Sequence, residues 1–425
     1  MTFIKKLHIK YKILAVSLLL VLIGAVAIGL TACAPQDEKP LEKATLYVYN
    51  WGEYISDGSE GSADTNKMFE DWCRENKGVD VTVIYSTYSS NESMYAKLSS
   101  GSVQYDVIVP SDYMIERMIK EDLLAPLNLE NFENLGNLHP DFFGENAKHN
   151  DYEIDPANTY SIPYMYGMIG IIYNTTMVEA DDPALGSWQL MWDERHAGNI
   201  LQFNNSRDAF GTAQYFLGLD VNSSDEAEWR LALDKLKAQK KVVQGYVMDE
   251  IFNKMENGSA AIAAYYAGDF LSMYENNPDL EFFYPREGTN LYVDAMCIPK
   301  TSQNKEIAEW YIDFMLSEEP AVANAEYTYY ASPNLAVQQN EDYIDYMNEI
   351  KEGGFDLMYG TDSVKTSSYK NLDPEMLILI NSLWEELKSD IDVGLPIYII
   401  CGGILAVLIG GGGYLAIRKR KRDRY

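Results

Sequence analysis

Aromatic and acidic side chains gather in short motifs that end, follow or lie within segments that have the pattern of β-strands. The motifs are Tyr49-Asn50-Trp51-Gly52-Glu53-Tyr54, Ser111-Asp112-Tyr113, Tyr265-Tyr266 and Tyr292-Val293-Asp294. Aromatic faces attract cations, and a carboxylate beside such a face supplies the charge-assisted hydrogen bonds that hold an ammonium group. The motifs therefore predict a binding site for an organic cation. The competing interpretation is that these rings simply pack in the core.

No catalytic or metal-binding arrangement accompanies these motifs. The sequence has no G-x-S-x-G elbow, no Walker loop and no G-x-G-x-x-G after a strand, and no histidine stands in a familiar order with a serine or cysteine nucleophile. The four histidines and four cysteines are scattered at spacings that metal sites do not use. We expect a protein that is not an enzyme and has no cofactor and no metal. Cys73 and Cys297 are left either to pair or to stay free.

Length and charge narrow the class of partner. The chain has 425 residues, and 34 Lys+Arg against 64 Asp+Glu give a formal net charge of −30. Phosphate recognition needs a positive surface, so this acidity argues against a nucleic-acid partner. A negative surface attracts cations instead. The length allows two to three ordinary domains.

The N-terminal segment has the pattern of a secretory signal. Lysines within residues 5–12 precede an apolar run that ends at Leu30-Thr31-Ala32-Cys33. This ending resembles the bacterial lipobox, in which the preceding peptide is removed and the new N-terminal cysteine is acylated. We expect residues 1–32 to be a signal peptide with a lipobox, Cys33 to be lipidated and residues 33–44 to be a polar linker. The alternative is an ordinary N-terminal membrane anchor with an incidental cysteine.

A second hydrophobic segment stands near the C-terminus. Residues 393–417 carry no charge, and five basic residues, 418–422, follow at once. The segment is long enough to span a bilayer as a helix. By the positive-inside rule, both basic flanks face the cytoplasm. We therefore expect a transmembrane helix at 393–417, a basic cytoplasmic tail at 418–425, and the remainder on the extracellular face of the cell membrane.

The residues between these ends predict two α/β lobes. The first part is expected to hold strands at 45–50, 79–83 and 105–109, and helices at 64–76, at 114–119 and after a capping box at Ser89-Ser90-Asn91-Glu92. The second is expected to hold strands at 167–173 and 260–266, and helices at 187–194, 208–219 and 225–237. Alternating strands and helices are typical of parallel sheets. Such lobes present the C-terminal ends of their strands to a shared crevice.

Six motifs in collinear order carry a family resemblance. They are residues 49–54 (YNWGEY), 83–88 (VIYSTY), 91–98 (NESMYAKL), 105–113 (YDVIVPSDY), 160–164 (YSIPY) and 332–336 (SPNLA). The segment from about residue 45 to residue 336 resembles the spermidine/putrescine-binding proteins of bacterial ABC transporters. This resemblance implies an α/β, two-lobed type II periplasmic-binding-protein fold with hinge crossovers, followed here by the C-terminal transmembrane helix. The implied domains are lobe 1 at 45–163 with 293–335, and lobe 2 at 164–292 with 336–390.

The same resemblance implies a function and a set of ligand-binding residues. A polyamine, putrescine or spermidine, is expected to bind in the interlobe cleft and to be delivered to permease subunits coupled to a cytoplasmic ATPase. The implied ligand-binding residues are the aromatic Trp51, Tyr54, Tyr113, Tyr266, Tyr292 and Tyr330, the acidic Glu53, Asp208 and Asp294, and the polar Ser111 and Asn205. The acids would hold the ammonium groups, and the rings would stack on the methylene chain.

Asn205 departs from the family pattern, because spermidine binders typically carry a second acid at this place. One carboxylate fewer suggests one ammonium group fewer, which favours putrescine as a hypothesis. Glu53 or Asp269 could restore the missing charge. The family's glutamine contact near the C-terminus has no clear counterpart, and Lys370 stands near its place.

Two other classes of function stay open. A ligand with a carboxylate, such as an opine, would require an arginine near the cleft, and Arg207 and Arg286 are the candidates, although both are more simply surface or structural residues. A membrane-tethered sensor or binding protein for another organic cation would use the same lobes. Against the sensor, only the short tail 418–425 follows the predicted membrane helix, which is too little for a signalling domain.

Overall fold

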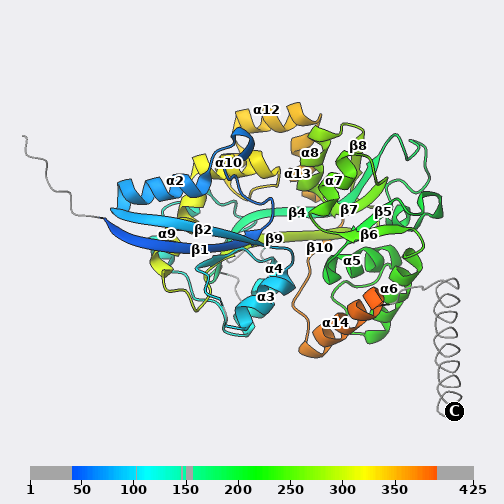
Figure 1. Cartoon of the computed structure of the whole chain (residues 1–425), viewed down its shortest axis with the longest axis horizontal. Helices are drawn as coiled ribbons and strands as arrows, with labels where there is room; N and C mark the ends of the chain where they lie inside the picture. Colours follow the sequence, from blue (N-terminus) through cyan, green and yellow to red (C-terminus); the bar gives the residue numbers. More distant parts are fainter. Residues whose placement is uncertain (1–40, 102, 145–146, 150–156, 390–425) are drawn as a thin grey trace, which may run out of the picture.

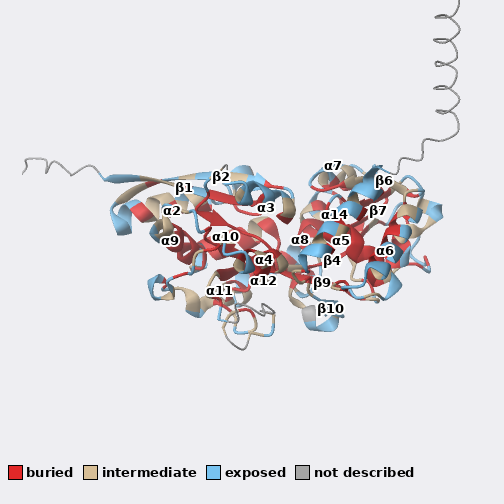
Figure 2. Ribbon diagram, turned by 90° about the horizontal axis from the view of Figure 1, so that it is seen from below, coloured by how far each residue is buried: buried red, intermediate tan, exposed pale blue. Residues whose placement is uncertain are grey.

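The computed structural model describes residues 41–101, 103–144, 147–149 and 157–389. Helices packed on β-strands form two lobes that lie end to end (Figure 1). Figure 2 shows the same two lobes from a perpendicular direction, with buried residues concentrated along the strands of each. The predicted signal peptide, Cys33, and the segments 393–417 and 418–425 fall outside the described residues.

Ten strands in the described part of the chain form one mixed sheet that runs through both lobes. Their order is β2-β1-β3-β9-β4-β7-β5-β6, with β10 beside β9 and β8 beside β4. The strands are β1 (Glu42–Trp51), β2 (Val79–Tyr88), β3 (Val107–Ile108), β4 (Ser161–Asn174), β5 (Ile200–Phe203), β6 (Val243–Val247), β7 (Ile262–Tyr266), β8 (Leu280–Phe283), β9 (Thr289–Cys297) and β10 (Thr366–Ser367).

Pairing is parallel toward the two ends of the sheet and antiparallel in the middle. β1 runs parallel to β2 and β3, and β5 runs parallel to β6 and β7. β9 is antiparallel to β3 and β4, and β4 is antiparallel to β7. β4 and β9 are therefore the strands that connect the two lobes. The lobe boundaries expected from the sequence, at 163/164 and 292/293, fall within these two strands and remain predictions.

The helices flank this sheet on both faces. Those of the first half are α2 (Thr65–Trp72), α3 (Asn91–Ser99), α4 (Asp112–Lys120), α5 (Ser206–Leu217), α6 (Glu226–Gln239) and α7 (Glu250–Glu256). Those of the second half are α8 (Ala267–Asn276), α9 (Lys305–Met315), α10 (Glu318–Thr328), α11 (Leu335–Gln338), α12 (Glu341–Ile350), α13 (Gly354–Tyr359) and α14 (Pro374–Ser389). The segment 187–194, expected as a helix, instead forms the short 3₁₀ turns Trp188–Trp192 and Glu194–His196.

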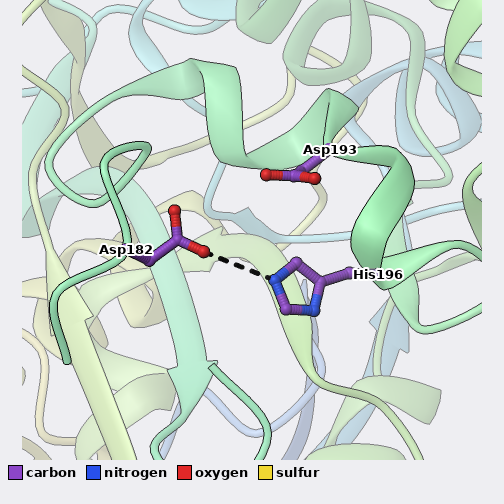
Figure 3. Close-up of side chains that lie close together, drawn as sticks. All are labelled: Asp182, Asp193 and His196. Atoms are coloured by element: carbon purple, nitrogen blue, oxygen red, sulfur yellow. Dashed lines mark ion pairs between the residues drawn. The ribbon is translucent and has the colours of Figure 1, made fainter. Parts of the chain in front are cut away.

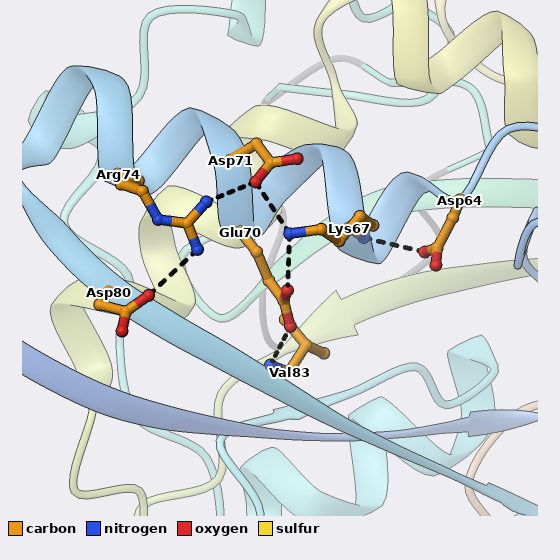
Figure 4. A network of polar contacts seen from close by, with 7 residues as sticks. All are labelled: Asp64, Lys67, Glu70, Asp71, Arg74, Asp80 and Val83. Atoms are coloured by element: carbon orange, nitrogen blue, oxygen red, sulfur yellow. Dashed lines mark hydrogen bonds and ion pairs between the residues drawn. The ribbon is translucent and has the colours of Figure 1, made fainter.

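Helix α2 shows how local sequence fixes an element beside its strand. The Asp64 side chain accepts a hydrogen bond from the Lys67 backbone N–H at 2.8 Å and so caps the helix. Glu70 accepts from the backbone N–H of Val83 in β2 at 3.0 Å, within a run of ion pairs along the exposed face (Figure 4). Phe69 is fully buried on the opposite face. Exposed ion pairs contribute little, so the buried ring does most to hold α2 in place.

The start of α3 differs from its prediction by one residue. Ser90, rather than Ser89, is the N-cap, and it exchanges hydrogen bonds with Ser93 in a capping box. The backbone of the first turn then places Asn91 and Glu92 at the wall of the interlobe pocket. The predicted capping box uses Glu92 as a capping side chain. In the structure, Glu92 instead accepts a hydrogen bond from the hydroxyl of Tyr113 in α4.

Helices α5, α6 and α14 share one core. Phe210 of α5, Trp229 and Leu236 of α6, and Leu383 and Leu387 of α14 are buried together. This packing fixes the N-terminus of α5, which carries two of the predicted site residues. The cysteines left open by the sequence, Cys73 and Cys297, are both buried and do not form a disulfide with each other.

The predicted fold class needs one correction. Within the described ranges, no helix is long and apolar enough to cross a membrane. The longest of these helices, α14, has 16 residues and ends with the charged Glu385, Glu386 and Lys388, whereas a span needs about 20 mostly apolar residues. The two-lobed α/β architecture is confirmed, whereas the C-terminal transmembrane helix that the prediction included is not among the helices of the described residues. The linker prediction also changes, because β1 begins at Glu42, three residues inside it.

Candidate functional site

A pocket lies between the lobes, where strands of both end. Its empty space, open solvent included, is ≈ 720 Å³. Its lining contains nine aromatic residues, six acids and, among the described residues, no lysine, arginine or histidine. The aromatic residues are Trp51, Tyr54, Tyr88, Tyr113, Tyr265, Tyr266, Tyr292, Tyr330 and Tyr369, and the acids are Glu92, Asp112, Asp208, Asp249, Asp269 and Asp294. The pocket is therefore suited to a cation with apolar parts.

The structure brings ten of the eleven predicted ligand-binding residues to this pocket. They are Trp51, Tyr54, Ser111, Tyr113, Asn205, Asp208, Tyr266, Tyr292, Asp294 and Tyr330. The eleventh, Glu53, lines a neighbouring hollow instead. Its backbone has φ 48°, in the left-handed region, so the turn after β1 directs successive side chains differently from an extended strand.

Several lining residues escaped the sequence reasoning. The sequence suggests Asp269 only as a replacement charge and does not indicate Asp249, although each stands near the start of a helix, α8 or α7. Tyr369 and Asn290 reach the pocket through the pairing of β10 with β9, and the backbone N–H of Tyr369 donates to Asn290. No local pattern signals a contact between residues this far apart in the chain.

Asp294, in β9, is a buried carboxylate with unused hydrogen-bonding capacity. It is 4% exposed, and its Oδ2 accepts from the Tyr54 hydroxyl at 2.8 Å. Its Oδ1 is buried and has no hydrogen-bond partner among the described residues, and the same holds for the Tyr292 hydroxyl. Burial raises the pKa of Asp294 to about 7, because the charged form is poorly solvated there. An N–H donor from a ligand would stabilise the ionised form.

Asp208 lies in the first turn of α5. Its Oδ2 accepts from the Tyr266 hydroxyl at 2.7 Å and from Asn205 Nδ2 at 2.5 Å. Asn205 is also the N-cap, since its Oδ1 accepts from the Asp208 backbone N–H at 2.9 Å. Asn205 therefore orients the carboxylate in addition to lining the pocket. Burial raises the pKa of Asp208, and the hydrogen bonds from Asn205 and Tyr266 oppose that rise.

Asp269 supplies a third buried carboxylate, at the start of α8. The Tyr330 hydroxyl donates to its Oδ2 at 2.9 Å. Burial raises the pKa of Asp269 to about 8. Asp208, Asp269 and Asp294 thus each hold a tyrosine hydroxyl and each resist ionisation when no cation is near.

The first-lobe wall is a small polar network. Asn91 donates to the Ser111 hydroxyl at 3.0 Å and to the Tyr113 hydroxyl at 3.1 Å. Tyr113 in turn donates to Glu92 at 2.9 Å. These bonds hold Ser111 and Tyr113 at the pocket surface and leave the carboxylate of Glu92 beside them.

Aromatic rings face one another around the acids. The rings of Tyr54 and Tyr330 meet edge to face with centroids 4.7 Å apart, and those of Tyr266 and Tyr292 with centroids 5.5 Å apart. Trp51 packs against Tyr88 at 4.7 Å and donates its indole N–H to the Val109 carbonyl. Hydrogen-bonded, packed rings of this kind give rigid walls for methylene groups and negative faces for cations.

A separate group of side chains has possible ligand atoms close enough together to coordinate a metal ion. Ligand atoms of Asp182, Asp193 and His196 lie within 4.8 Å of one another, and Asp182 Oδ2 is 3.7 Å from His196 Nε2. Figure 3 shows the Asp182 carboxylate facing the imidazole. Arg195, however, donates to Asp182 at 2.8 Å and also to Asp193. The guanidinium already occupies the position of a cation between the two carboxylates. None of these residues lines the interlobe pocket.

The chain matches a known family model and several known proteins. Residues 67–349 match the model of the bacterial extracellular solute-binding protein. The spermidine/putrescine-binding periplasmic protein of Escherichia coli (strain K12) is 32% identical over 317 residues, which is 74% of this chain and 84% of that protein. The putrescine/cadaverine-binding protein of Pseudomonas aeruginosa is 28% identical over 359 residues, 81% of this chain and 93% of that protein.

Solved structures agree with these matches. A structure from Listeria monocytogenes, described as a spermidine/putrescine ABC transporter, is 33% identical to this chain, with a TM-score of 0.70. The match covers 81% of this chain and 99% of that chain. The spermidine/putrescine ABC transporter substrate-binding protein of Streptococcus pneumoniae is 32% identical, with a TM-score of 0.62 and coverage of 81% of this chain and 98% of that chain.

Proposed function

The chain belongs to the bacterial extracellular solute-binding protein family, and from this premise we propose that it captures polyamines, putrescine or spermidine, in the interlobe pocket. As a member of this family it binds a solute and is not an enzyme. The relatives named for spermidine, putrescine and cadaverine support this choice of ligand. We further propose that it delivers the polyamine to the permease of an ABC importer.

One observation carries the proposal: the pocket holds four buried carboxylates, those of Asp112, Asp208, Asp269 and Asp294, and, within the described residues, no basic side chain. An isolated buried carboxylate is unfavourable unless a positive group pairs with it. Asp294 also keeps a buried oxygen that has no partner in the described part of the chain. A flexible chain with an ammonium group at each end matches both features.

The binding mode follows from the positions of the acids and rings. One ammonium group would reach Asp294 and another Asp208, while the methylenes pack between the rings around Tyr266 and Tyr292. Since β4 and β9 connect the lobes, small changes in these strands would open and close the pocket. The closed form is then what a permease recognises, and no bond of the ligand changes.

The choice between putrescine and spermidine does not follow from counting carboxylates. The preference for putrescine rested on Asn205 replacing an acid, but Asp269 brings another buried carboxylate to the same pocket. We therefore propose polyamines as a class, and a direct competition between the two decides the preference.

We also propose that Cys33 anchors the protein to the outer face of the cell membrane through a lipid. The support is the sequence alone, because this residue lies outside the described ranges. The test is incorporation of a labelled fatty acid during expression in bacteria. Labelling should disappear in Cys33→Ser, and persistent labelling would contradict this assignment.

The main test is calorimetric titration of the full-length protein in detergent, after unfolding and refolding to remove carried-over ligand. Putrescine, spermidine and spermine are the test ligands, and arginine is the control. Binding of a polyamine with a Kd of about 1–10 μM or tighter, without binding of arginine, is the expected result. Absence of binding to every polyamine would refute the proposal.

A further inference from the structure

Arg207, in α5, is a buried arginine that uses only part of its hydrogen-bonding capacity. It is 4% exposed, and its Nη2 donates to Asn222 at 3.1 Å and to the Lys370 carbonyl at 3.5 Å. Its Nε and Nη1 are buried and have no hydrogen-bond partner among the described residues. An unsatisfied buried donor destabilises the folded state, most of all when it is charged. Such a group has room for an acceptor from outside the chain, either a water molecule or an ion.

The aromatic surroundings of Arg207 do not provide that acceptor. Its guanidinium carbon lies 4.6 Å from the ring centroid of Tyr369, 5.5 Å from that of Tyr113 and 5.6 Å from that of Trp229. Rings satisfy the faces of a guanidinium, whereas its N–H groups point outward in its own plane. The rings therefore hold the group rigidly and leave the donors available.

Arg207 lines a second hollow, whose empty space, open solvent included, is ≈ 410 Å³. The two share only Glu92 and Tyr113 as lining residues. In contrast to the acidic pocket, the hollow gathers Arg117, Arg207 and Lys370 against the single acid Glu92. Arg117 is paired with Glu121 at 3.0 Å, so Arg207 contributes more of the positive potential than Arg117 does.

The N-terminus of α5 adds to this potential. Ser206 is the first residue of the helix and lines the hollow. The positive end of a helix dipole, together with N–H groups of the first turn, favours an anion. The hollow also meets α4 and the segment before α14, so its walls come from widely separated parts of the chain.

We propose that this hollow binds a small oxyanion through the free N–H donors of Arg207, with Lys370 adding charge. The oxyanion is either inorganic phosphate or the carboxylate of a small organic acid, since both accept hydrogen bonds from a guanidinium. The proposal is independent of polyamine binding, because the hollow is lined by three basic residues and one acid, whereas the interlobe pocket is lined by six acids and, among the described residues, no basic side chain.

The test titrates the full-length protein in detergent, without polyamine, at constant ionic strength. Inorganic phosphate, sodium acetate and sodium chloride are the probes, and heat is measured. We expect saturable one-site binding of phosphate or acetate but not of chloride, weakened about tenfold or more in Arg207→Lys and in Lys370→Gln. The probe that binds more tightly identifies the source of the oxyanion.

Lys365→Gln is the matched control, because Lys365 is exposed and lies outside the hollow. Its binding should equal that of the unmodified protein. Circular dichroism checks folding, and if Arg207→Lys does not fold, Lys370→Gln decides. The proposal is overturned if no probe binds saturably, if the folded variants bind as tightly as the unmodified protein, or if Lys365→Gln loses as much affinity as they do.

Discussion

Replacing Asp294 by asparagine tests the proposed pocket most directly. Asparagine has nearly the volume of aspartate and retains an oxygen that can accept from the Tyr54 hydroxyl, now at 2.8 Å from Asp294. The change therefore removes charge and leaves the packing of a 4% exposed side chain nearly unaltered. Any loss of affinity then reports the missing carboxylate.

The expected loss is large because the ligand's ammonium group would stay buried without its partner. Removing one member of a buried ion pair costs about 3–5 kcal/mol, which is a roughly 150- to 5,000-fold rise in Kd. The substitution should have the opposite effect on the folding stability of the unliganded protein, which should rise rather than fall. Burial raises the pKa of Asp294 from 3.8 to about 7, so the folded state binds a proton that the unfolded state releases. Stability is therefore lost as the pH rises from about 4 through about 7, and asparagine avoids that loss.

The assay combines calorimetry with thermal unfolding of the full-length protein. Titrations with putrescine and with spermidine are done at about pH 8. Melting curves without ligand are recorded at about pH 6 and about pH 8, on either side of the pH at which Asp294 ionises in the folded protein. Asp279→Asn is the matched control, because Asp279 is exposed. It should change neither affinity nor melting temperature.

Two results would refute this reasoning. A Kd within about threefold of the unmodified protein, less than 1 kcal/mol, would show that Asp294 does not hold an ammonium group. A melting temperature of Asp294→Asn that falls at both pH values would show that the substitution disrupts the pocket, so that lost affinity would no longer report charge.

Three further predictions follow from other parts of the structure. Because burial raises the pKa of Asp269 to about 8, lowering the pH from about 9 to about 6 protonates it, and polyamine affinity measured by titration should fall, with a flatter profile in Asp269→Asn. In Gly268→Ala the new Cβ would lie 2.5 Å from the ring of Tyr330, so we expect about 1–3 kcal/mol of destabilisation in thermal melts and weaker polyamine binding. Gly245→Ala, with no atom within 4 Å of its added Cβ, is the control and should retain both. Ser90→Ala removes the N-cap of α3 and should cost about 0.5–2 kcal/mol in urea unfolding, and an unchanged midpoint would contradict the capping role.

The sequence by itself determined the elements and much of the pocket. Hydrophobic periodicity located β1, β2 and β7, because alternating or continuous apolar residues are a local signal. The residues at strand ends identified Tyr54 and Tyr266, since parallel strands bring their C-terminal ends to one edge. Asp294 lies within the antiparallel strand β9, and the family resemblance identified it. The first residues of helices were predicted less accurately, as the one-residue shift at α3 shows. Ser89 and Ser90 are equally suitable as N-caps by residue type, and only the backbone conformation decides which of them caps the helix.

Only the tertiary structure decided which of these side chains meet. Glu53 belongs to a promising motif, yet its backbone turn takes it to a different hollow. Asp269 and Tyr369 join the pocket through the packing of α8 and the pairing of β10 with β9.

The two candidate arginines were equivalent in sequence but not in the fold. Arg286 is exposed and donates to the Leu185 carbonyl at 3.2 Å, whereas Arg207 is enclosed by rings with free donors. Local patterns report residue type and periodicity within a few positions. Contacts between residues 79 and 240 positions apart, such as Tyr369 with Asn290 and Tyr54 with Asp294, depend on the tertiary packing, which no short stretch of sequence contains. The burial that shifts the pKa values of such residues depends on the same packing.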